Sequence, residues 1–400
     1  MKASVMRCML GGQFLMMLAL EMGNTWMALM IAGLEDVPAS QVVFWNMLAL
    51  LLPMVASMVM APLWGYLSDR HGYRPMLMRA AMALCLSQIM MLFASSTRVI
   101  LLIRLLQGLF AGFLAAMQAY ALAFDNREQR GRILVRLQSA RALGTGFAGV
   151  TGGALLGAGG FTLLYAAAAL LCFFALGWMY MALPRVEVTR TETVERTDAR
   201  GMSRMLLVSG ILIILAQLIR FFPEAVFTLA MNNRMPGQYL ATGLLCSLPA
   251  IGLLASTSWT GRRIDAARAC PRLRRRFLLG CALLGGFSML LQALDAGYVV
   301  SALARFSWGI TLGALLPALF CEISDRAHAP GAAVGMANAF AKAGNILGVG
   351  LGGFAAGLMP LSSLFLLLAL LYGLFMLIVR VGFREEKISE FSGGKEILSQ

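Results

Sequence analysis

Seven charged side chains interrupt stretches of the sequence that are otherwise apolar. They are Glu21, Arg104, Arg141, Arg220, Glu224, Arg305 and Lys342. A charge at the middle of a bilayer costs about 2.5–3.5 kcal/mol on insertion scales, so such residues usually face a partner or a wet interior. Carboxylates of this kind can carry protons. Because five of the seven are cations, the set favours an anionic ligand, provided that all of them face inward.

Glu21 is the strongest candidate for a proton carrier, because the sequence shows no partner for it nearby. A cation that approaches and leaves a buried carboxylate changes its affinity for protons. We therefore expect Arg104 or Arg141 to control the protonation of Glu21. Glu224 is a second acidic candidate, but it follows Arg220 by four residues, so the two can also pair with each other on one helix face.

Amides and cations within the same apolar stretches are the groups that could contact a polar ligand. The predicted ligand-contacting residues are Asn24, Gln118, Arg141, Gln217, Arg220, Asn338 and Lys342. Enzymatic chemistry is not indicated. The chain has only two histidines, and no metal-ligand cluster, phosphate-binding loop or nucleophile triad appears in it.

The composition shows whether the chain folds in water or in a lipid bilayer. Of the 400 residues 60% are hydrophobic, the mean hydropathy is +0.78, and 13% are charged, against about 25% in soluble domains. This predicts an all-α integral membrane protein, because a soluble domain could not hide so much apolar surface. The net charge of +14 does not indicate a nucleic-acid partner, because the arginines lie between apolar runs and so reflect topology.

Twelve apolar segments are long enough to cross a bilayer, which needs about 20 residues. They cover residues 8–34, 42–64, 76–93, 99–124, 133–156, a sixth ending near 183, 205–231, 238–258, 277–294, 299–320, 332–358 and a twelfth ending near 380. We expect six-helix bundles at 1–183 and 205–381, a cytoplasmic linker at 184–204 and a cytoplasmic tail at 382–400. With both termini inside, 26 of the 33 lysines and arginines fall in inner segments or in the first turns of the helices that follow them, and 2 fall in outer turns. This bias supports the orientation.

The two predicted bundles repeat each other. Arg104, Gly108 and Gly112 recur as Arg305, Gly309 and Gly313; Gly144, Gly152 and Gly153 recur as Gly344, Gly352 and Gly353; Gly65 and Asp69 recur as Gly261 and Asp265. The offsets are 201, 200 and 196 residues. Three matches in order at nearly one offset indicate parallel structural repeats.

These residues also carry a family resemblance. Gly65, Asp69, Arg70, Gly72 and Arg74 match the signature G-x-L-x-D-R-x-G-R-[KR] between helices two and three of the major facilitator superfamily, with Tyr73 in place of its first basic residue. Arg104, Gln107, Gly108 and Gly112 match its helix-four signature, R-x-x-Q-G-x-x-x-G. Residues 144–153 approximate the helix-five signature of antiporters, with Ala148 and Gly149 in place of a glycine and a proline. The chain resembles this superfamily over essentially its whole length, and its drug:proton antiporter branch most.

The resemblance implies a transporter of the bacterial inner membrane that works as a monomer in the lipid bilayer by alternating access. We expect it to export a small organic molecule, anionic and siderophore-like, with no cofactor and with the proton gradient as its energy source. The alternative is multidrug efflux of neutral or cationic lipophilic compounds, and an importer is a third possibility.

Two groups of residues are expected to serve the conformational change. A latch that stabilises one orientation of the bundles comprises Gly65, Asp69, Arg70, Gly72, Arg74 and Asp265. A glycine series that permits close helix packing or acts as a moving hinge comprises Gly144, Gly152, Gly153, Gly344, Gly348, Gly352 and Gly353.

Overall fold

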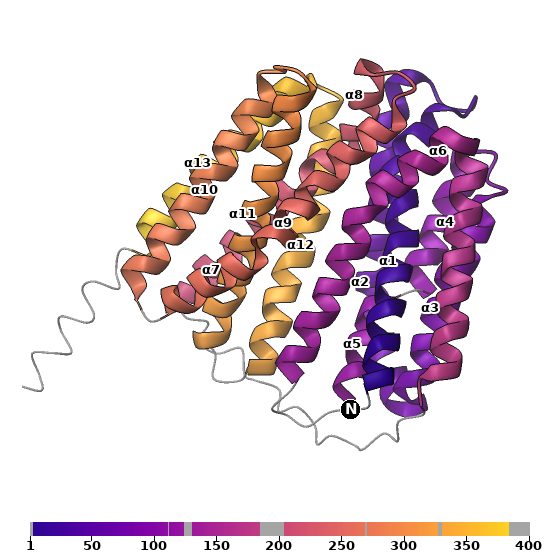
Figure 1. Cartoon of the computed structure of the whole chain (residues 1–400), viewed down its shortest axis with the longest axis horizontal. Helices are drawn as coiled ribbons and strands as arrows, with labels where there is room; N and C mark the ends of the chain where they lie inside the picture. Colours follow the sequence, from indigo (N-terminus) through magenta and orange to yellow (C-terminus); the bar gives the residue numbers. More distant parts are fainter. Residues whose placement is uncertain are drawn as a thin grey trace, which may run out of the picture. The chain divides into compact units, whose positions relative to one another are not determined.

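The computed structural model of the chain describes residues 3–110, 112–123, 130–184, 204–268, 270–326 and 330–383. Every regular element within these ranges is helical (Figure 1). The all-α architecture predicted from the composition is therefore confirmed. The predicted linker at 184–204 and tail at 382–400 lie almost entirely outside the described residues.

The chain folds into two compact units. Unit 1 comprises Met1–Val194, Glu224–Ala250 and Gly353–Leu358, and unit 2 comprises Glu195–Pro223, Ile251–Gly352 and Met359–Gln400. Two short parts of the C-terminal half thus group with the N-terminal bundle. The boundaries of the two six-helix bundles stay a prediction.

Unit 1 is built on a long pairing between its first helix and its longest helix. Its helices are α1 (Ala3–Ala32), α2 (Val42–His71), α3 (Tyr73–Met91), α4 (Thr97–Phe110), α5 (Phe113–Ala123) and α6 (Arg130–Ala182), joined by the short α8 (Phe227–Arg234) and the first part of α9 (Tyr239–Arg268). α1 packs along α6, α2 packs against α4, and α3 packs against α4, α5 and α6. The core between them is apolar and rich in methionine.

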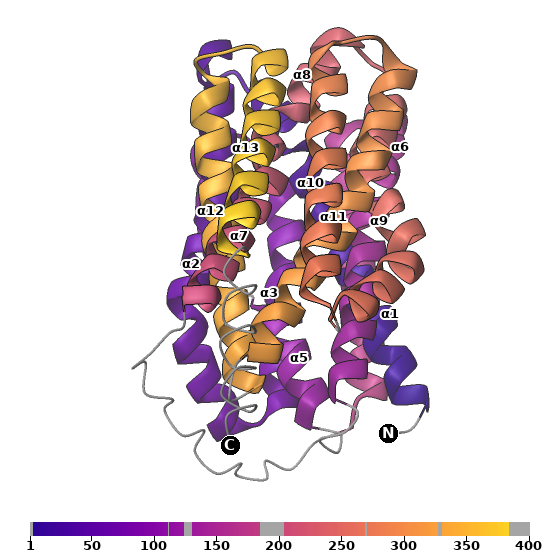
Figure 2. The same ribbon diagram turned by 90° about the vertical axis from the view of Figure 1, so that its left-hand side faces the viewer.

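Unit 2 is organised around α10. Its helices are α7 (Arg204–Phe221), the remainder of α9, α10 (Pro271–Ala293), α11 (Tyr298–Arg326), α12 (Pro330–Ala356) and α13 (Leu361–Gly382). α10 runs alongside α11 and α13 in both views (Figures 1 and 2). α7 packs against α11 and α13.

Two of the predicted helices are interrupted and two others are joined, each at a residue that explains the difference. The predicted fourth helix divides into α4 and α5 near Gly112, whose φ is +69°, a value that side-chain-bearing residues rarely adopt. The predicted fifth and sixth helices join in α6 across a kink at Gly159 and Gly160, where the φ of Gly160 is +69°. The predicted seventh helix ends at Phe221 and continues as a 3-10 turn, Phe222–Ala225, that contains Pro223.

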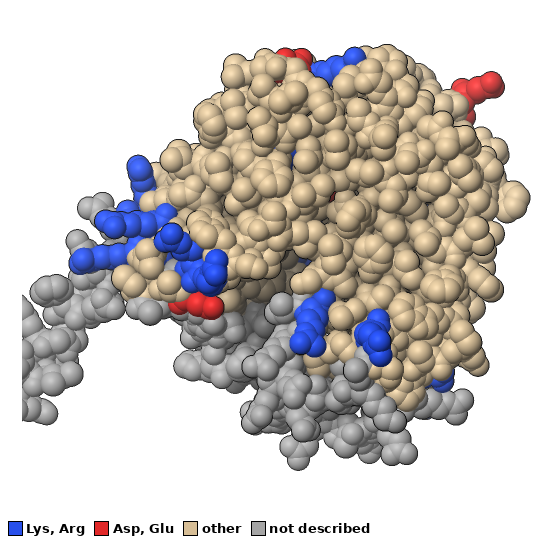
Figure 3. Space-filling view, viewed as in Figure 1, with Lys and Arg blue, Asp and Glu red and all other residues tan. Residues whose placement is uncertain are grey.

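The described helices suit a membrane. Nine spans within the described ranges have the length and hydropathy needed to cross a bilayer. Figure 3 shows an uncharged surface along each unit, with most charged side chains near the ends of the helices. One of the nine spans contains the kink of α6, and α3, which carries Arg74 and Arg79, is not among them. The count of twelve stays a prediction.

The repeat predicted from the sequence is visible in the helix packing. A methyl group placed on Gly108 of α4 would come within 2.6 Å of the Cα atom of Pro53 and 2.8 Å of the Cβ atom of Ala56, both on α2. In unit 2 a methyl group on Gly252 of α9 would lie 3.3 Å from the Cα atom of Gly309 of α11. Gly108 and Gly309 are repeat partners, so equivalent helices cross at equivalent positions in the two halves.

Candidate functional site

A polar cluster of buried and half-buried side chains surrounds Glu21 in unit 1. Asn24, one turn further along α1, donates a hydrogen bond from its Nδ2 to Glu21 Oε2 over 3.1 Å. Arg104 of α4 is only 4% exposed and donates from Nη1 to Gln107 Oε1 over 2.8 Å. Glu21 and Arg104 also interact electrostatically. The structure thus brings the predicted carboxylate and one of its two predicted cations together.

The prediction that Glu21 has no partner nearby in the sequence is wrong, because Asn24 binds it. Residues three and four apart lie on the same face of a helix, and this spacing lets the Asn24 amide reach the carboxylate. Asn24, predicted to contact a ligand, is therefore also a neighbour of the predicted proton carrier. Its Oδ1 atom is buried and has no hydrogen-bond partner among the described residues.

Tyr165 of α6 is a member of this cluster that the sequence analysis missed. Its side chain is 2% exposed and interacts electrostatically with Arg104. The ring occupies space beside Gly23, where a methyl group would come within 2.9 Å of its Cε1 atom. The hydroxyl of Tyr165 and Nε of Arg104 are buried without a protein partner in the described part of the chain. Polar groups of this kind are available to water or to a ligand.

The repeat of Arg104 in unit 2 has different surroundings. Arg305 is 6% exposed, and its guanidinium lies 5.5 Å from the ring centroid of Trp308, which stands where unit 1 has Gln107. Trp308 donates from Nε1 to the hydroxyl of Tyr372 over 3.0 Å. The two halves therefore share the buried arginine but differ in what surrounds it.

The other predicted ligand-contacting residues are distributed over both units. Gln118 on α5 and Arg141 on α6 are half-buried in unit 1. In unit 2, Gln217 of α7 donates from Nε2 to Asn345 Oδ1 of α12 over 2.9 Å. Asn338 and Lys342 lie one turn apart on α12 and are both exposed.

Arg220 and Glu224 do not share a continuous α-helix. Arg220 is half-buried at the end of α7, with its guanidinium 5.4 Å from the ring centroid of Phe221. Glu224 is exposed in the following 3-10 turn. The regular i, i+4 arrangement that the sequence suggested for them is thus interrupted before Pro223.

The glycine series of α6 lies against α1 and α9. A methyl group on Gly144 would come within 2.6 Å of the Phe14 carbonyl oxygen, and one on Gly152 within 2.7 Å of Trp26 Nε1. Gly153 faces the backbone of Tyr239. These positions let backbones approach closely, which is the packing role that small residues have in membrane helices. The hinge role stays a prediction.

The same series recurs on α12. Methyl groups on Gly344 and Gly348 would come within 2.5 Å of the Ile214 carbonyl oxygen and 2.6 Å of the Leu218 carbonyl oxygen, both on α7. Gly352 continues this face of α12 and lies against the Phe222 carbonyl. Gly353, which belongs to unit 1, lies against the side chain of Met47.

Gly149 stands where the antiporter signature has a proline. In the structure it lies at the crossing of α6 and α9, where a methyl group would come within 2.6 Å of the Gly243 carbonyl oxygen. The Ser247 hydroxyl accepts a hydrogen bond from the Val150 amide over 3.1 Å at the same crossing. Gly149 therefore permits a close contact between two helices.

The predicted latch lies where α2 turns into α3. α2 extends to His71, so Gly65, Asp69 and Arg70 belong to its last turns. Gly72 has a φ of +94° and makes the turn. Asp69 accepts a hydrogen bond from the Tyr73 hydroxyl over 3.2 Å. Burial, and then the charge of Asp69, raise the pKa of Tyr73, so its hydroxyl keeps the proton that this bond requires.

Arg74 joins the turn to the far end of the same unit. Its Nη2 donates to the carbonyl oxygen of Tyr180 over 2.6 Å, and its guanidinium lies 5.3 Å from the Tyr180 ring centroid. Two carboxylates of the next inner loop that could pair with Arg70 and Arg74, Asp125 and Glu128, lie outside the described residues. Arg74 thus fixes the start of α3 to the end of α6.

Replacing Arg74 with alanine is expected to destabilise unit 1 by about 1–3 kcal/mol, because a hydrogen bond from a charged donor is worth about 1.5–3 kcal/mol and the ring contact adds to it. Thermal unfolding of the purified protein measures the effect. Arg70→Ala is the matched control, because Arg70 is exposed on the same turn. Equal melting temperatures for the two variants would contradict the assignment.

Unit 2 holds a counterpart of this contact. Arg274, 200 residues after Arg74, forms a 2.8 Å ion pair with Glu322 of α11. Its guanidinium lies 5.6 Å from the ring centroid of Phe383, directly after α13. Asp265, the predicted latch residue of this half, and Gly261, the repeat partner of Gly65, lie in the last turns of α9.

Membrane-length helices in two repeated halves, with charged side chains inside them, define a polytopic membrane protein built as secondary transporters are. A family model described as Major Facilitator Superfamily matches residues 9–331, and the chain belongs to that family. It is therefore a membrane transporter and not an enzyme.

Known proteins resemble the chain over most of its length. The staphyloferrin B transporter of Staphylococcus aureus is 26% identical over 352 residues, which cover 84% of this chain and 82% of that protein. A multi-drug resistance efflux pump PmrA homolog of Lactococcus lactis is 28% identical over 310 residues, 74% of this chain and 73% of that protein. The crystal structure of a D-xylose-proton symporter aligns with a TM-score of 0.72 at 15% identity, covering 93% and 96% of the two chains, and shares the fold.

Proposed function

We propose that this transporter couples the inward movement of protons to the export of a small organic anion, siderophore-like in its carboxylate chemistry. It works as a monomer in a bacterial inner membrane, with both termini in the cytoplasm. The observation that carries the proposal is the cluster in which buried Arg104 interacts with the half-buried Glu21 and Glu21 accepts a hydrogen bond from the half-buried Asn24. The bacterial relatives support the cellular setting.

Proton coupling requires a group whose charge changes where water is scarce. Protonating Glu21 would remove the negative charge that acts on Arg104, and so change the electrostatic free energy of the cluster. A ligand or proton drives a conformational change only when it interacts differently with the two conformations. If Arg104 lies close to Glu21 in one conformation and far from it in the other, Glu21 binds a proton with different affinity in the two conformations. Glu224 is the second proposed acidic group.

The proposed anion preference rests on the cations outside this cluster. Lys342 is exposed in the interior of α12, two residues before Gly344. At about 100° per residue, its side chain points away from the face that packs against α7. A lysine at such a position favours a water-filled space. Arg141 and Arg220, both half-buried, are proposed to join it at the substrate.

The relatives support two substrate classes. One is named for staphyloferrin B, and one for multi-drug resistance efflux. Export of neutral or cationic lipophilic compounds is therefore the second candidate function. The charge of the proposed contacts distinguishes the two, because Arg141 and Lys342 would attract an anion and repel a cation.

Arg141→Ala and Lys342→Ala are each expected to slow export of a polycarboxylate chelator by about 10-fold to 100-fold. The loss of a charge-assisted hydrogen bond, about 1.5–3 kcal/mol, corresponds to that range. Uptake into inverted membrane vesicles with an imposed pH gradient measures it, beside a neutral and a cationic dye. Arg98→Ala, a change at an exposed arginine that begins α4, is the control. Normal anion transport by both variants would overturn the charge argument.

A further inference from the structure

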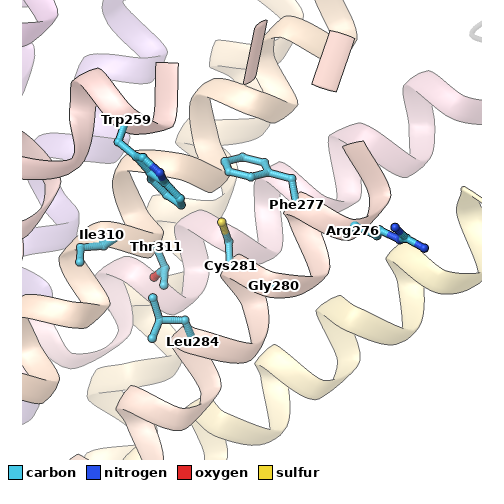
Figure 4. A pocket seen from close by; sticks show the side chains of 8 residues that line it. All are labelled: Trp259, Arg276, Phe277, Gly280, Cys281, Leu284, Ile310 and Thr311. Carbon is cyan, nitrogen blue, oxygen red and sulfur yellow. The ribbon is translucent and has the colours of Figure 1, made fainter. Parts of the chain in front are cut away.

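Unit 2 contains a pocket that none of the predicted site residues lines. It has a volume of about 170 Å³ and lies between α9, α10 and α11 (Figure 4). The Trp259 and Phe277 rings, 6.4 Å apart between centroids, lie on either side of its upper part as drawn. The sulfur of Cys281 points toward the space between them. Leu284 and Ile310 also line the pocket, so its lining is mostly apolar.

The mouth of the pocket is strongly basic. Arg276 of α10 is one of the lining residues, although its side chain extends away from the two rings in Figure 4. The guanidinium of Arg263 lies 5.6 Å from the ring centroid of Trp259. Neither arginine has a carboxylate partner among the residues that the structure describes. Figure 3 shows Lys and Arg side chains gathered at this end of unit 2.

The start of α10 adds positive potential of its own. The first two turns of this helix carry Arg272, Arg274, Arg275 and Arg276, and its first turn has no acidic residue. A helix N-terminus is already the positive end of the helix dipole, so cations there are unfavourable without an anion. Glu322 balances Arg274. The remaining charge is complementary to an anionic ligand.

The pocket combines this charge with an apolar lining along α10. Arg276 and Leu284 are eight residues apart, which is about 12 Å along a helix. A ligand that fills the site must be anionic at one end and apolar for about that distance. The volume is below the roughly 300–1,000 Å³ of pockets that enclose a drug-sized molecule, so it suits part of one hydrocarbon chain.

We propose that this pocket binds an anionic phospholipid. The phosphate lies beside Arg263 at the basic end of the pocket, and one acyl chain passes over Gly280 against Trp259 and Phe277. Basic pockets between membrane helices bind anionic headgroups on the cytoplasmic side, which is the predicted side of this end. Trp259 has the amphipathic character of side chains at a membrane interface.

Gly280 allows the pocket to be closed without disturbing the fold. A methyl group at this position would meet no atom within 4 Å, so Gly280→Leu fills the space instead of forcing helices apart. Gly373 of α13 is equally open and does not line the pocket. Gly373→Leu is therefore the matched control.

Native mass spectrometry of the delipidated full chain tests the proposal. We expect dioleoyl phosphatidylglycerol to bind the wild type and Gly373→Leu at least 10-fold more tightly than Gly280→Leu. Dioleoyl phosphatidylcholine, with the same chains and no net charge, should bind the wild type at least 10-fold more weakly. Equal binding of phosphatidylglycerol to the two leucine variants would overturn the proposal.

The basic mouth is tested separately. The double variant Arg263→Gln, Arg276→Gln should lose the preference for phosphatidylglycerol, whereas Arg380→Gln, at the exposed end of α13, should keep it. Glycerol phosphate, the headgroup chemistry without chains, should not compete at concentrations where the lipid saturates. Competition by glycerol phosphate, or an unchanged preference in the double variant, would show that the pocket is not a phospholipid site.

Discussion

Replacing Glu21 with glutamine is expected to abolish transport driven by a pH gradient while leaving exchange of substrate down its own gradient in place. Glutamine keeps the length of the side chain and can still accept a hydrogen bond from Asn24, which donates to Glu21 in the wild type. It cannot take up or release a proton, so the link between proton movement and conformation is lost. Accumulation in vesicles should fall to the level of membranes without the protein.

Two measurements separate this result from a folding defect. The rate at which labelled substrate exchanges for unlabelled substrate without a pH gradient should stay within about twofold of the wild-type rate. A tenfold loss would mean a change of about 1.36 kcal/mol in the barrier, which is more than the loss of proton coupling alone explains. Glu35→Gln is the control for the loss of a carboxylate, because Glu35 is exposed just after α1. Full gradient-driven accumulation by Glu21→Gln would remove Glu21 from the coupling mechanism.

Gly144→Val is expected to be the most destabilising single change within the pairing of α1 and α6. Even a methyl group at Gly144 would come within 2.6 Å of the Phe14 carbonyl oxygen and 2.9 Å of Met17 Cβ. Both atoms belong to α1 and neither is at the end of a flexible side chain, so the helices must separate. Overpacking of this kind costs about 1–3 kcal/mol and sometimes more.

The same helix supplies the control for this prediction. Gly177 of α6 has no atom within 4 Å of an added methyl group, so Gly177→Val tests helix propensity without the clash. Thermal unfolding in detergent should give a clearly lower melting temperature for Gly144→Val than for Gly177→Val. Similar melting temperatures would mean that α1 and α6 are not held at the distance seen here.

Much of the fold could be predicted because it depends on sequence-local quantities. Hydropathy over about 20 residues identifies membrane helices, and the repeated glycines locate equivalent crossings, as Gly108 and Gly309 illustrate. The interruption at Gly112 could not be placed, because a glycine inside a helix and a glycine with φ of +69° look the same in a sequence. The kink at Gly160 lies where the sequence predicted a turn, just after the end of the fifth helix at residue 156. The boundary of α2 was placed seven residues early, because its last turns carry polar and charged residues.

The candidate site was only partly predictable, because partners distant in the sequence leave no local signal. The charges of Glu21 and Arg104 stood out against apolar neighbours. Tyr165 did not, because a tyrosine in an apolar helix resembles any buried aromatic residue, and only the structure brings it to Arg104. Tyr180 was missed for a related reason: it binds Arg74 partly through its backbone carbonyl, which every residue has.

We propose that charged residues within the apolar helices border a water-filled path that opens in turn to each side of the membrane. Cysteine labelling in vesicles of known orientation tests it without knowledge of the substrate. Arg141→Cys, Lys342→Cys and Leu370→Cys would be compared in a background in which the seven native cysteines are replaced. Leu370 is the lipid-facing control, since it is an apolar side chain that is 72% exposed on α13.

A membrane-impermeant thiol reagent applied to either side should modify Arg141→Cys and Lys342→Cys and leave Leu370→Cys unmodified. Reagent on one side would reach these positions only when the path is open to that side. If Arg141→Cys and Lys342→Cys were as unreactive as Leu370→Cys from both sides, the charged residues would not border an aqueous path.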